Sequence, residues 1–227
     1  MKKIWILWGM WPQASAHFYD LMIQKTIEQK PEVSNQDYPY MLISNIPVPD
    51  LIHSKSDQAL TVHMVNQAAI DLEKAWVDFL IMTCNTMHLF QDEIMQWVSI
   101  PFVSMIDCVV DQVSYDQVKI VWLLWSSTTL ESWLYTDQLI QRWVKTILPA
   151  IDEYEEISQV ISRYISWTIA SKDIEYLEKI CCKIYAQWAE SIILGCTELP
   201  LIVQDFPETY SFYKSDEILA DKTLGLI

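Results

Sequence analysis

Two cysteines lie in matching sequence contexts in the two halves of this 227-residue chain. Cys84 and Cys196 each follow a tryptophan by eight residues, and a short apolar run leads up to each thiol. A thiol that titrates near the working pH can take a proton from carbon or return one. Two such thiols on opposite faces of a small substrate can invert a stereocentre, because one removes a proton while the other delivers one. The matched contexts therefore indicate a pair of acid and base groups.

Polar residues follow both cysteines directly. Asn85 and Thr86 come after Cys84, and Thr197 comes after Cys196. Each cysteine stands at the carboxyl end of an expected strand and before an expected helix. Free backbone N–H groups at a helix N-terminus lower the pKa of a thiol and bind a carboxylate, and ligands of open α/β sheets bind at this end of the strands. We therefore expect a small carboxylate substrate there.

The remaining cysteines fit a structural interpretation better. We interpret three of them as small buried hydrophobic residues: Cys108, Cys181 and Cys182. A metal site would pair Cys84 with His88 at helical spacing, but no further ligand cluster accompanies the two in the sequence. We therefore expect no metal site. Five cysteines are an odd number, which does not suggest a disulfide framework.

Apolar runs alternate with amphipathic stretches along the chain, a pattern typical of parallel βαβ units. The expected strands are residues 4–8, 40–46, 77–83, 100–105, 119–125, 144–148 and 191–195. The expected helices are residues 13–30, 56–75, 88–96, 130–142, 153–168 and 173–187. Residues 4–8 (IWILW) are echoed by 121–125 (VWLLW), which indicates two related halves. The sequence predicts an α/β protein with a first domain at 1–108 plus 206–227 and a second at 109–205.

Charge and hydropathy exclude several classes of partner. The formal net charge of −15 argues against nucleic acid or an anionic membrane surface. No apolar run of the sequence is long enough to span a membrane. The basic and apolar start of the chain imitates a short signal peptide, but its echo near residue 121 indicates a first strand instead. We expect a cytoplasmic protein that acts on a small molecule.

Eleven tryptophans against three glycines is an unusual composition, because glycine makes up about 7% of an ordinary chain. Trp76, Trp143 and Trp188 stand between a helical segment and the next strand, where a left-handed residue usually ends the helix. Three others crowd a strand-to-helix turn: Trp5, Trp8 and Trp11. Backbone must approach a ligand closely at such a turn. We hypothesise that these positions encode glycine, through UGA codons that some bacterial lineages read as glycine and another code table as tryptophan.

The chain resembles the aspartate/glutamate racemase family, the cofactor-independent amino-acid racemases, and most of all its aspartate racemase branch. The resemblance covers nearly the whole chain. It rests on residues 8–12 (WGMWP, where the family reads GGMGP), 84–88 (CNTMH), 122–126 (WLLWS) and 195–198 (GCTE). Two cysteine motifs at this separation are specific, whereas the first segment alone would be a weak signal.

The resemblance implies two similar Rossmann-like α/β domains with parallel sheets, related by a pseudo-two-fold axis, with the active site between them. It implies that no pyridoxal phosphate or other cofactor is needed, and that the protein is a homodimer. Cys84 and Cys196 would be the two acid/base residues. The residues implied to hold or line the substrate are Asn85, Thr86, Thr197, Met10, Trp11 and Leu51.

Two positions depart from the aspartate racemase pattern. Leu51 stands where those enzymes typically have arginine, and Ser166 stands where they have lysine. Both basic groups are expected to meet a side-chain carboxylate, so a broader or less acidic amino-acid substrate is credible. Three residues are candidates to compensate: His53, Lys55 and Lys172.

Two other functions stay open at this point. A sister chemistry on the same scaffold would be hydantoin racemisation, maleate isomerisation or arylmalonate decarboxylation. A non-catalytic amino-acid-binding protein is the alternative from another class.

Overall fold

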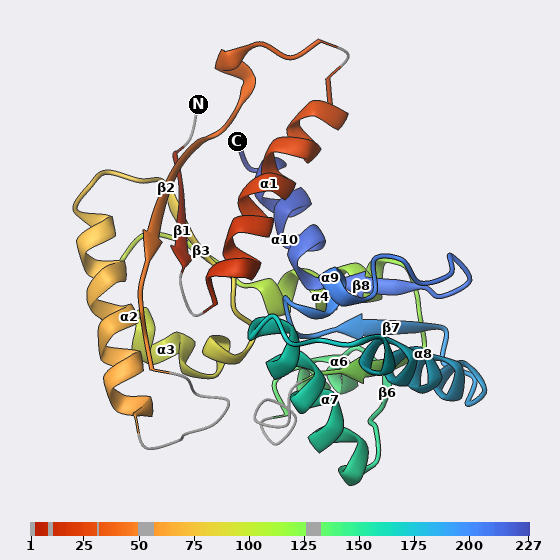
Figure 1. The fold of residues 1–227 in the computed structure, drawn as a ribbon. Helices are drawn as coiled ribbons and strands as arrows, with labels where there is room; N and C mark the ends of the chain where they lie inside the picture. Colours follow the sequence, from red (N-terminus) through yellow and green to blue (C-terminus); the bar gives the residue numbers. More distant parts are fainter. Residues whose placement is uncertain (1–2, 9–10, 31, 50–56, 126–132) are drawn as a thin grey trace. The chain divides into compact units, whose positions relative to one another are not determined.

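The computed structural model describes residues 3–8, 11–30, 32–49, 57–125 and 133–227, drawn in colour in Figure 1. The chain divides into two compact units. One unit comprises Met1–Cys108 with Asp216–Ile227, and the other comprises Val109–Ser215. Each unit is built on its own four-stranded sheet.

The sheet of the first unit has the strand order β2-β1-β3-β4, and all of its pairings are parallel. Its strands are β1 (Lys3–Trp8), β2 (Tyr40–Asn45), β3 (Phe79–Met82) and β4 (Phe102–Val103). The helices of this part are α1 (Pro12–Glu28), η1 (Asn35–Asp37), α2 (Gln58–Glu73), η2 (Thr86–Phe90), α3 (Gln91–Ile94) and α10 (Ser215–Leu224). A further helix, α4 (Met105–Tyr115), begins in this part and continues into the second unit. Parallel sheets need such crossover helices because successive strands run in the same direction.

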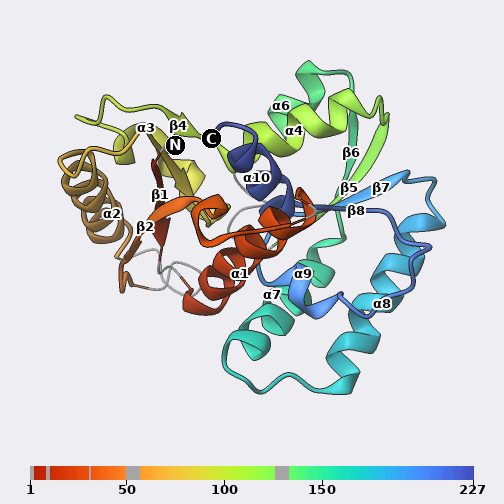
Figure 2. The ribbon, with the colours of Figure 1, turned by 90° about the horizontal axis from the view of Figure 1, so that it is seen from above.

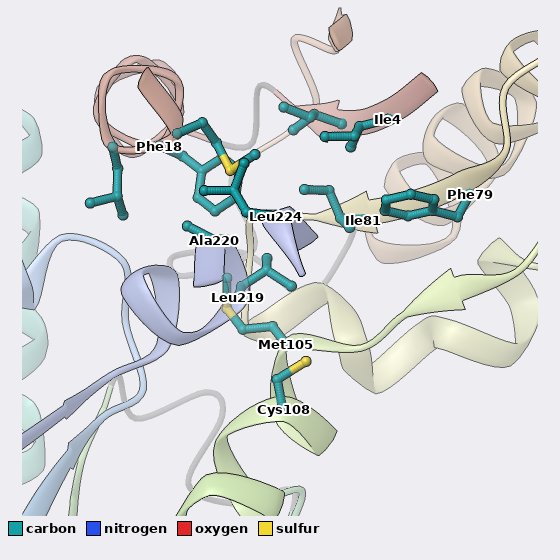
Figure 3. Close-up of a cluster of buried hydrophobic side chains, with 12 residues drawn as sticks. Ile4, Phe18, Phe79, Ile81, Met105, Cys108, Leu219, Ala220 and Leu224 are labelled. Carbon is teal, nitrogen blue, oxygen red and sulfur yellow. The ribbon is translucent and has the colours of Figure 1, made fainter. Parts of the chain in front are cut away.

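Both faces of the first sheet are covered, which explains why all four residues of β3 are buried. Phe79 and Ile81 point into one apolar cluster, which also contains Phe18 of α1 and Leu219 of α10 (Figure 3). The other two residues of the strand, at positions 80 and 82, pack into a second cluster with α2 and α3. The alternation follows from the two-residue period of a strand. α10 therefore supplies core residues to a sheet whose strands lie at the other end of the sequence.

The second unit repeats this plan with the strand order β6-β5-β7-β8, again all parallel. Its strands are β5 (Ile120–Leu124), β6 (Lys145–Ile147), β7 (Ser191–Leu194) and β8 (Phe212–Lys214). Its helices are α6 (Thr136–Gln141), α7 (Ile151–Ile165), α8 (Ser171–Tyr185) and α9 (Leu199–Ile202). Figure 2 shows α7 and α8 on one side of this sheet and α6 on the other.

The two sheets have the same topology. In each, the first strand of the unit lies between the second and the third, and the fourth strand pairs with the third. The expectation of an α/β protein made of two similar parallel domains is confirmed. The sequence placed the return to the first domain at residue 206, whereas the units change at residue 216. The reason is β8, which pairs with β7 and so keeps residues up to 215 in the second unit.

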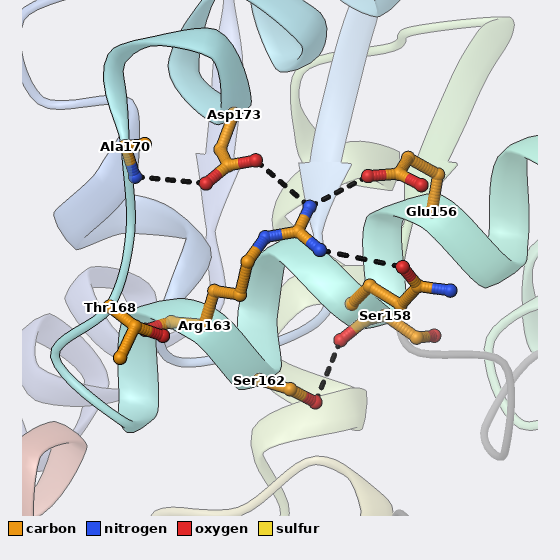
Figure 4. A network of polar contacts seen from close by, with 8 residues as sticks. Glu156, Ser158, Ser162, Arg163, Thr168, Ala170 and Asp173 are labelled. Carbon is orange, nitrogen blue, oxygen red and sulfur yellow. Dashed lines mark hydrogen bonds and ion pairs between the residues drawn. The ribbon is translucent and has the colours of Figure 1, made fainter.

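A polar network joins α7 to α8 in the second unit (Figure 4). The Nη2 atom of Arg163 lies 2.6 Å from a Glu156 carboxylate oxygen and 2.9 Å from one of Asp173. The backbone N–H of Ala170 donates to the other Asp173 oxygen at 2.9 Å. Burial alone would raise the pKa of Asp173, but this N–H and the guanidinium hold it below the usual value. The network fixes the turn in which Trp167 lies.

Six tryptophans adopt the left-handed backbone that favours glycine. Their φ angles lie between 57° and 69°, and the residues are Trp76, Trp97, Trp133, Trp143, Trp167 and Trp188. Gln117 is the one other non-glycine residue with positive φ in the part of the chain that the structure describes. The six indoles project into solvent, with exposed fractions from 58% at Trp133 to 88% at Trp143. The left-handed ends expected at Trp76, Trp143 and Trp188 are therefore confirmed, and the side chains add no packing that explains them.

Several elements were not predicted. The expected strand at residues 100–105 is the two-residue β4, and α4 begins at Met105 within that apolar run. The sequence pattern did not predict β8 or α10. Among the described residues, no helix combines the length and the apolar character that crossing a membrane requires.

Candidate active site

Cys84 and Cys196 occupy equivalent positions in the two units. β3 ends at Met82 and β7 ends at Leu194, so each cysteine lies two residues beyond the same strand of its sheet. Both cysteines are partly buried, and neither is in a disulfide. β3 and β7 each pair with the first strand of their unit. The sheet therefore presents one thiol at the carboxyl end of an inner strand in each unit, where open α/β sheets bind ligands.

The Cys84 segment is held by the ring of His88. The Nδ1 atom lies 2.8 Å from the carbonyl oxygen of Cys84, and the backbone N–H of Met105 donates to Nε2 at 3.0 Å. Since Nε2 accepts a hydrogen bond, the proton of the neutral ring is on Nδ1, which donates to the carbonyl. The ring also contacts Phe102 of β4, with 5.5 Å between ring centroids. His88 thus joins the loop after β3 to the start of α4.

Burial keeps His88 neutral. It lowers the pKa of the imidazole to about 4, although the hydrogen bond to the Cys84 carbonyl and the charge of Asp107 act in the opposite direction. A neutral ring is required by this arrangement, because a protonated Nε2 could not accept the N–H of Met105. A metal site that pairs His88 with Cys84 was one interpretation of the sequence. In the structure, His88 contacts backbone groups through both ring nitrogens and so positions the Cys84 segment.

The Cys196 segment contains a buried carboxylate. Glu198 is 1% exposed, and the thiol of Cys196 donates to its Oε2 atom at 2.9 Å. The hydroxyl of Thr197 donates to the same oxygen at 3.3 Å. Glu198 belongs to the second cysteine motif (GCTE), but the sequence did not predict a role for it. An acidic residue two positions after a candidate catalytic thiol was the signal in the sequence that could have identified it.

The helices expected after the two cysteines are short. Thr86–Phe90 forms a 3-10 helix that leads into the four-residue α3, and α9 after Cys196 also has only four residues. Short helices of this kind carry little of the macrodipole that was expected to lower the thiol pKa. A helix therefore follows each cysteine as expected, and its effect on the thiol pKa stays a prediction.

Trp125 fills the space beside the second cysteine motif. It directly follows β5, and the N–H of Gly195 donates to the carbonyl oxygen of Leu124 at 2.9 Å. A Cβ atom added to Gly195 would lie 2.8 Å from two ring carbons of Trp125. The indole is 1% exposed, and its Nε1 has no hydrogen-bond partner among the described residues. A large ring therefore occupies the position next to the residue that precedes Cys196.

The remaining predicted site residues are placed as follows. Asn85 is buried next to Cys84, and Thr86 is half-buried at the start of η2. Trp11 precedes α1 in an extended conformation. Met10 and Leu51 lie outside the described residues, as do His53 and Lys55. Ser166 directly follows α7 and Lys172 lies in the first turn of α8, and both are exposed.

The other cysteines are also outside any disulfide, and they differ in burial. Cys108 and Cys181 are buried, as expected, and burial raises the pKa of Cys181 to about 12. The expectation was wrong for Cys182, which is exposed and has its sulfur 2.8 Å from the hydroxyl of Tyr210. Histidine, cysteine and carboxylate side chains form no cluster of three that could hold a metal within the described ranges.

Two repeated parallel α/β units, each with a thiol beyond the equivalent strand, place this chain among the two-domain α/β proteins with paired cysteines. A sequence model of the Asp/Glu/Hydantoin racemases matches residues 7–218. The chain belongs to this family.

Individual relatives match almost end to end. The broad specificity amino-acid racemase RacX of Bacillus subtilis is 25% identical over 225 residues, which are 98% of this chain and 96% of RacX. The crystal structure of an aspartate racemase homologue from Pyrococcus horikoshii has a TM-score of 0.83 and 27% identity, covering 100% of this chain and 99% of that chain. The structure of the aspartate racemase of Picrophilus torridus has a TM-score of 0.84 and 25% identity, covering 99% of this chain and 95% of that chain.

Proposed function

We propose that this protein is a cofactor-independent amino-acid racemase in which Cys84 and Cys196 are the two acid/base groups. The single observation that carries the proposal is the equivalent position of the two thiols, each two residues beyond β3 or β7. The likeness to RacX and to an aspartate racemase supports an amino acid as the substrate. Cytoplasmic location and a homodimer remain part of the proposal.

The proposed chemistry is a proton exchange at the α-carbon. A thiolate takes the α-proton, so that an S–H bond forms as the C–H bond breaks and the electron pair stays on carbon. The second thiol then gives its proton to the opposite face of that carbon and becomes a thiolate. The two thiols supply both proton transfers, so no further group is needed to balance the reaction.

The neighbouring polar groups support a role in holding the amino acid. Thr197 uses its O–H proton toward Glu198, so its oxygen is left to accept a hydrogen bond, such as one from the substrate ammonium group. Asn85 is buried directly after Cys84 and carries two amide N–H donors that suit a carboxylate.

We propose a substrate range wider than aspartate. Leu51 and Ser166 carry no positive charge at the two positions where aspartate racemases typically do. An acidic side chain gains most of its specific recognition from such charge-assisted hydrogen bonds. The name of the RacX relative, a broad specificity enzyme, agrees with this proposal.

Racemisation can be tested by solvent exchange. The chain with glycine at the eleven tryptophan positions is incubated in D₂O with each enantiomer of a panel of amino acids. We expect α-deuterium incorporation together with formation of the opposite enantiomer for at least one amino acid. Exchange confined to hydantoins or other carboxylates would point to the sister chemistries, and tight binding without exchange would point to a binding protein.

The two cysteines can be tested separately. We expect Cys84→Ala and Cys196→Ala each to abolish racemisation, because inversion needs a proton acceptor on one face and a donor on the other. Cys182→Ala is the matched control, since it removes an exposed thiol of the same chain and should leave turnover unchanged. Full turnover by either of the first two variants would remove that cysteine from the mechanism.

A further inference from the structure

The two cysteine segments differ at one position that matters for proton transfer. Two residues after Cys84 the chain has Thr86, whereas two residues after Cys196 it has Glu198. Glu198 is almost completely buried, and its Oε2 atom accepts the thiol proton of Cys196 at 2.9 Å. The two cysteine segments follow equivalent strands and differ in charge.

A buried carboxylate at this distance favours one protonation state of the thiol. As a thiol, Cys196 donates a hydrogen bond to Glu198. As a thiolate, it would be a second negative charge beside a buried carboxylate, and like charges at short range strongly disfavour ionisation. Thr197 donates to the same oxygen of Glu198, which stabilises the carboxylate in its charged form.

The group that faces Glu198 does not offset its charge. Tyr164 of α7 faces the carboxylate, and burial together with the negative charge of Glu198 raises the pKa of its phenol, so this group brings no positive charge. Near Cys84, burial keeps His88 neutral, and Asp107 acts on that ring from α4.

We propose that Glu198 is a positioning residue that holds Cys196 as the proton-donating thiol of the resting enzyme and leaves Cys84 as the base. This inference rests on the proposed racemase function. In the first turnover Cys84 gains the α-proton and Cys196 gives its proton to the carbon, so the charge moves from one sulfur to the other. Loss of a proton from Cys84 to water and uptake of one by Cys196 from water restore the starting state.

Site-specific alkylation tests the inference without any substrate. The full chain, with glycine at the tryptophan positions, is treated with iodoacetamide across a range of pH, and the rate at each cysteine is read by peptide mass spectrometry. Only the thiolate reacts. We expect Cys84 to be alkylated faster than Cys196 near neutral pH, and Cys196 to reach its half-maximal rate at a higher pH. Equal rates and equal midpoints for the two cysteines would overturn the inference.

The variant Glu198→Gln removes the charge and keeps the shape of the side chain. We expect the half-maximal rate of Cys196 to move to lower pH, with about a tenfold faster reaction at neutral pH for each pH unit of movement. The profile of Cys84 should stay in place. Glu155→Gln, on the exposed side of α7, is the matched control with the same change in net charge. An unchanged Cys196 profile in a folded Glu198→Gln protein would also overturn the inference.

A kinetic measurement separates positioning from general damage. The equilibrium constant of racemisation is one, so kcat/KM must be equal for the two enantiomers in every variant. Glu198 raises the free energy of the complex in which Cys196 is a thiolate. The variant Glu198→Gln should therefore change the ratio of the kcat values for the two enantiomers, and the ratio of the two KM values should change by the same factor. A uniform loss in both directions would contradict the inference. If no amino acid is racemised at all, the proposed function fails while the alkylation result still stands by itself.

Discussion

His88 is the residue that fixes the first thiol in place. It bridges the carbonyl of Cys84 and the N–H of Met105 with two nitrogen atoms of one neutral ring. The sequence could show that a histidine follows Cys84 by four residues, but it could not show that both ring nitrogens are occupied by backbone. That information depends on α4, whose start lies 17 residues from the histidine in the chain.

The depressed pKa of His88 predicts an acid-sensitive fold of the first unit. The unfolded chain takes up the proton near pH 6.5 and the folded chain only near pH 4. The contribution to stability is therefore fully present above about pH 6.5 and is lost as the pH falls toward 4, by on the order of 3 kcal/mol. Denaturant unfolding at several pH values should show a flatter dependence for His88→Gln. His63→Gln on α2, an exposed position, should keep the original slope; the same flattening there would contradict the assignment.

Trp125 is a residue whose size conflicts with its surroundings. Its ring lies against Gly195 and buries an N–H without a partner among the described residues, which costs about 1–3 kcal/mol. We expect Trp125→Gly to open the space beside Cys196 and to raise the rate of its alkylation several-fold. Trp125→Phe keeps most of the bulk and serves as the control. Equal rates for the two variants would show that the ring does not limit access.

Helix ends are the elements at which the sequence was most informative. A tryptophan between a helical stretch and an apolar run predicted the left-handed residue at Trp76, Trp143 and Trp188, and the backbone has it at all three. Such ends follow from local chain geometry. Short elements such as β4 were not predictable in the same way, because two residues become a strand only through pairing with β3.

Trp143 offers a direct test of these helix ends. It lies between α6 and β6 with φ 61°. We expect Trp143→Gly to raise the free energy of unfolding by about 1 kcal/mol, because only glycine adopts this backbone without a steric cost from Cβ. Trp143→Ala keeps the Cβ atom, so it should raise the free energy of unfolding only slightly. Unfolding in denaturant compares the two; an equal gain from alanine would mean that loss of the exposed indole, and not relief of the backbone, is the cause.

At the scale of the whole molecule, the tryptophans follow a single pattern. Six adopt the backbone of glycine in solvent, and two in or directly after β5, Trp122 and Trp125, are buried with indole N–H groups that lack partners among the described residues. The fold that surrounds them matches the racemase structures along its whole length. We expect the protein made by its own cell to carry glycine at all eleven positions.

Reading the codons and the native peptides tests this expectation. UGA at the eleven codons and glycine in the corresponding peptides by mass spectrometry are the expected results. UGG codons would refute the hypothesis and would leave a chain with strained helix ends. The sequence alone could raise the hypothesis from composition and position, but the φ angles were needed to show what conformation the backbone adopts there.

The return of α10 to the first sheet has a consequence for the order in which the protein can fold during synthesis. Leu219, Ala220 and Leu224 complete the apolar cluster that contains Ile4 and Phe18, so the first half leaves the ribosome without a part of its core. Residues 109–215, in contrast, form a compact unit whose strands are all translated earlier. Nascent domains generally fold as units, N-terminal ones first. Here the inserted second unit is the one that can finish first, while the N-terminal unit must wait for the last turn of helix to emerge.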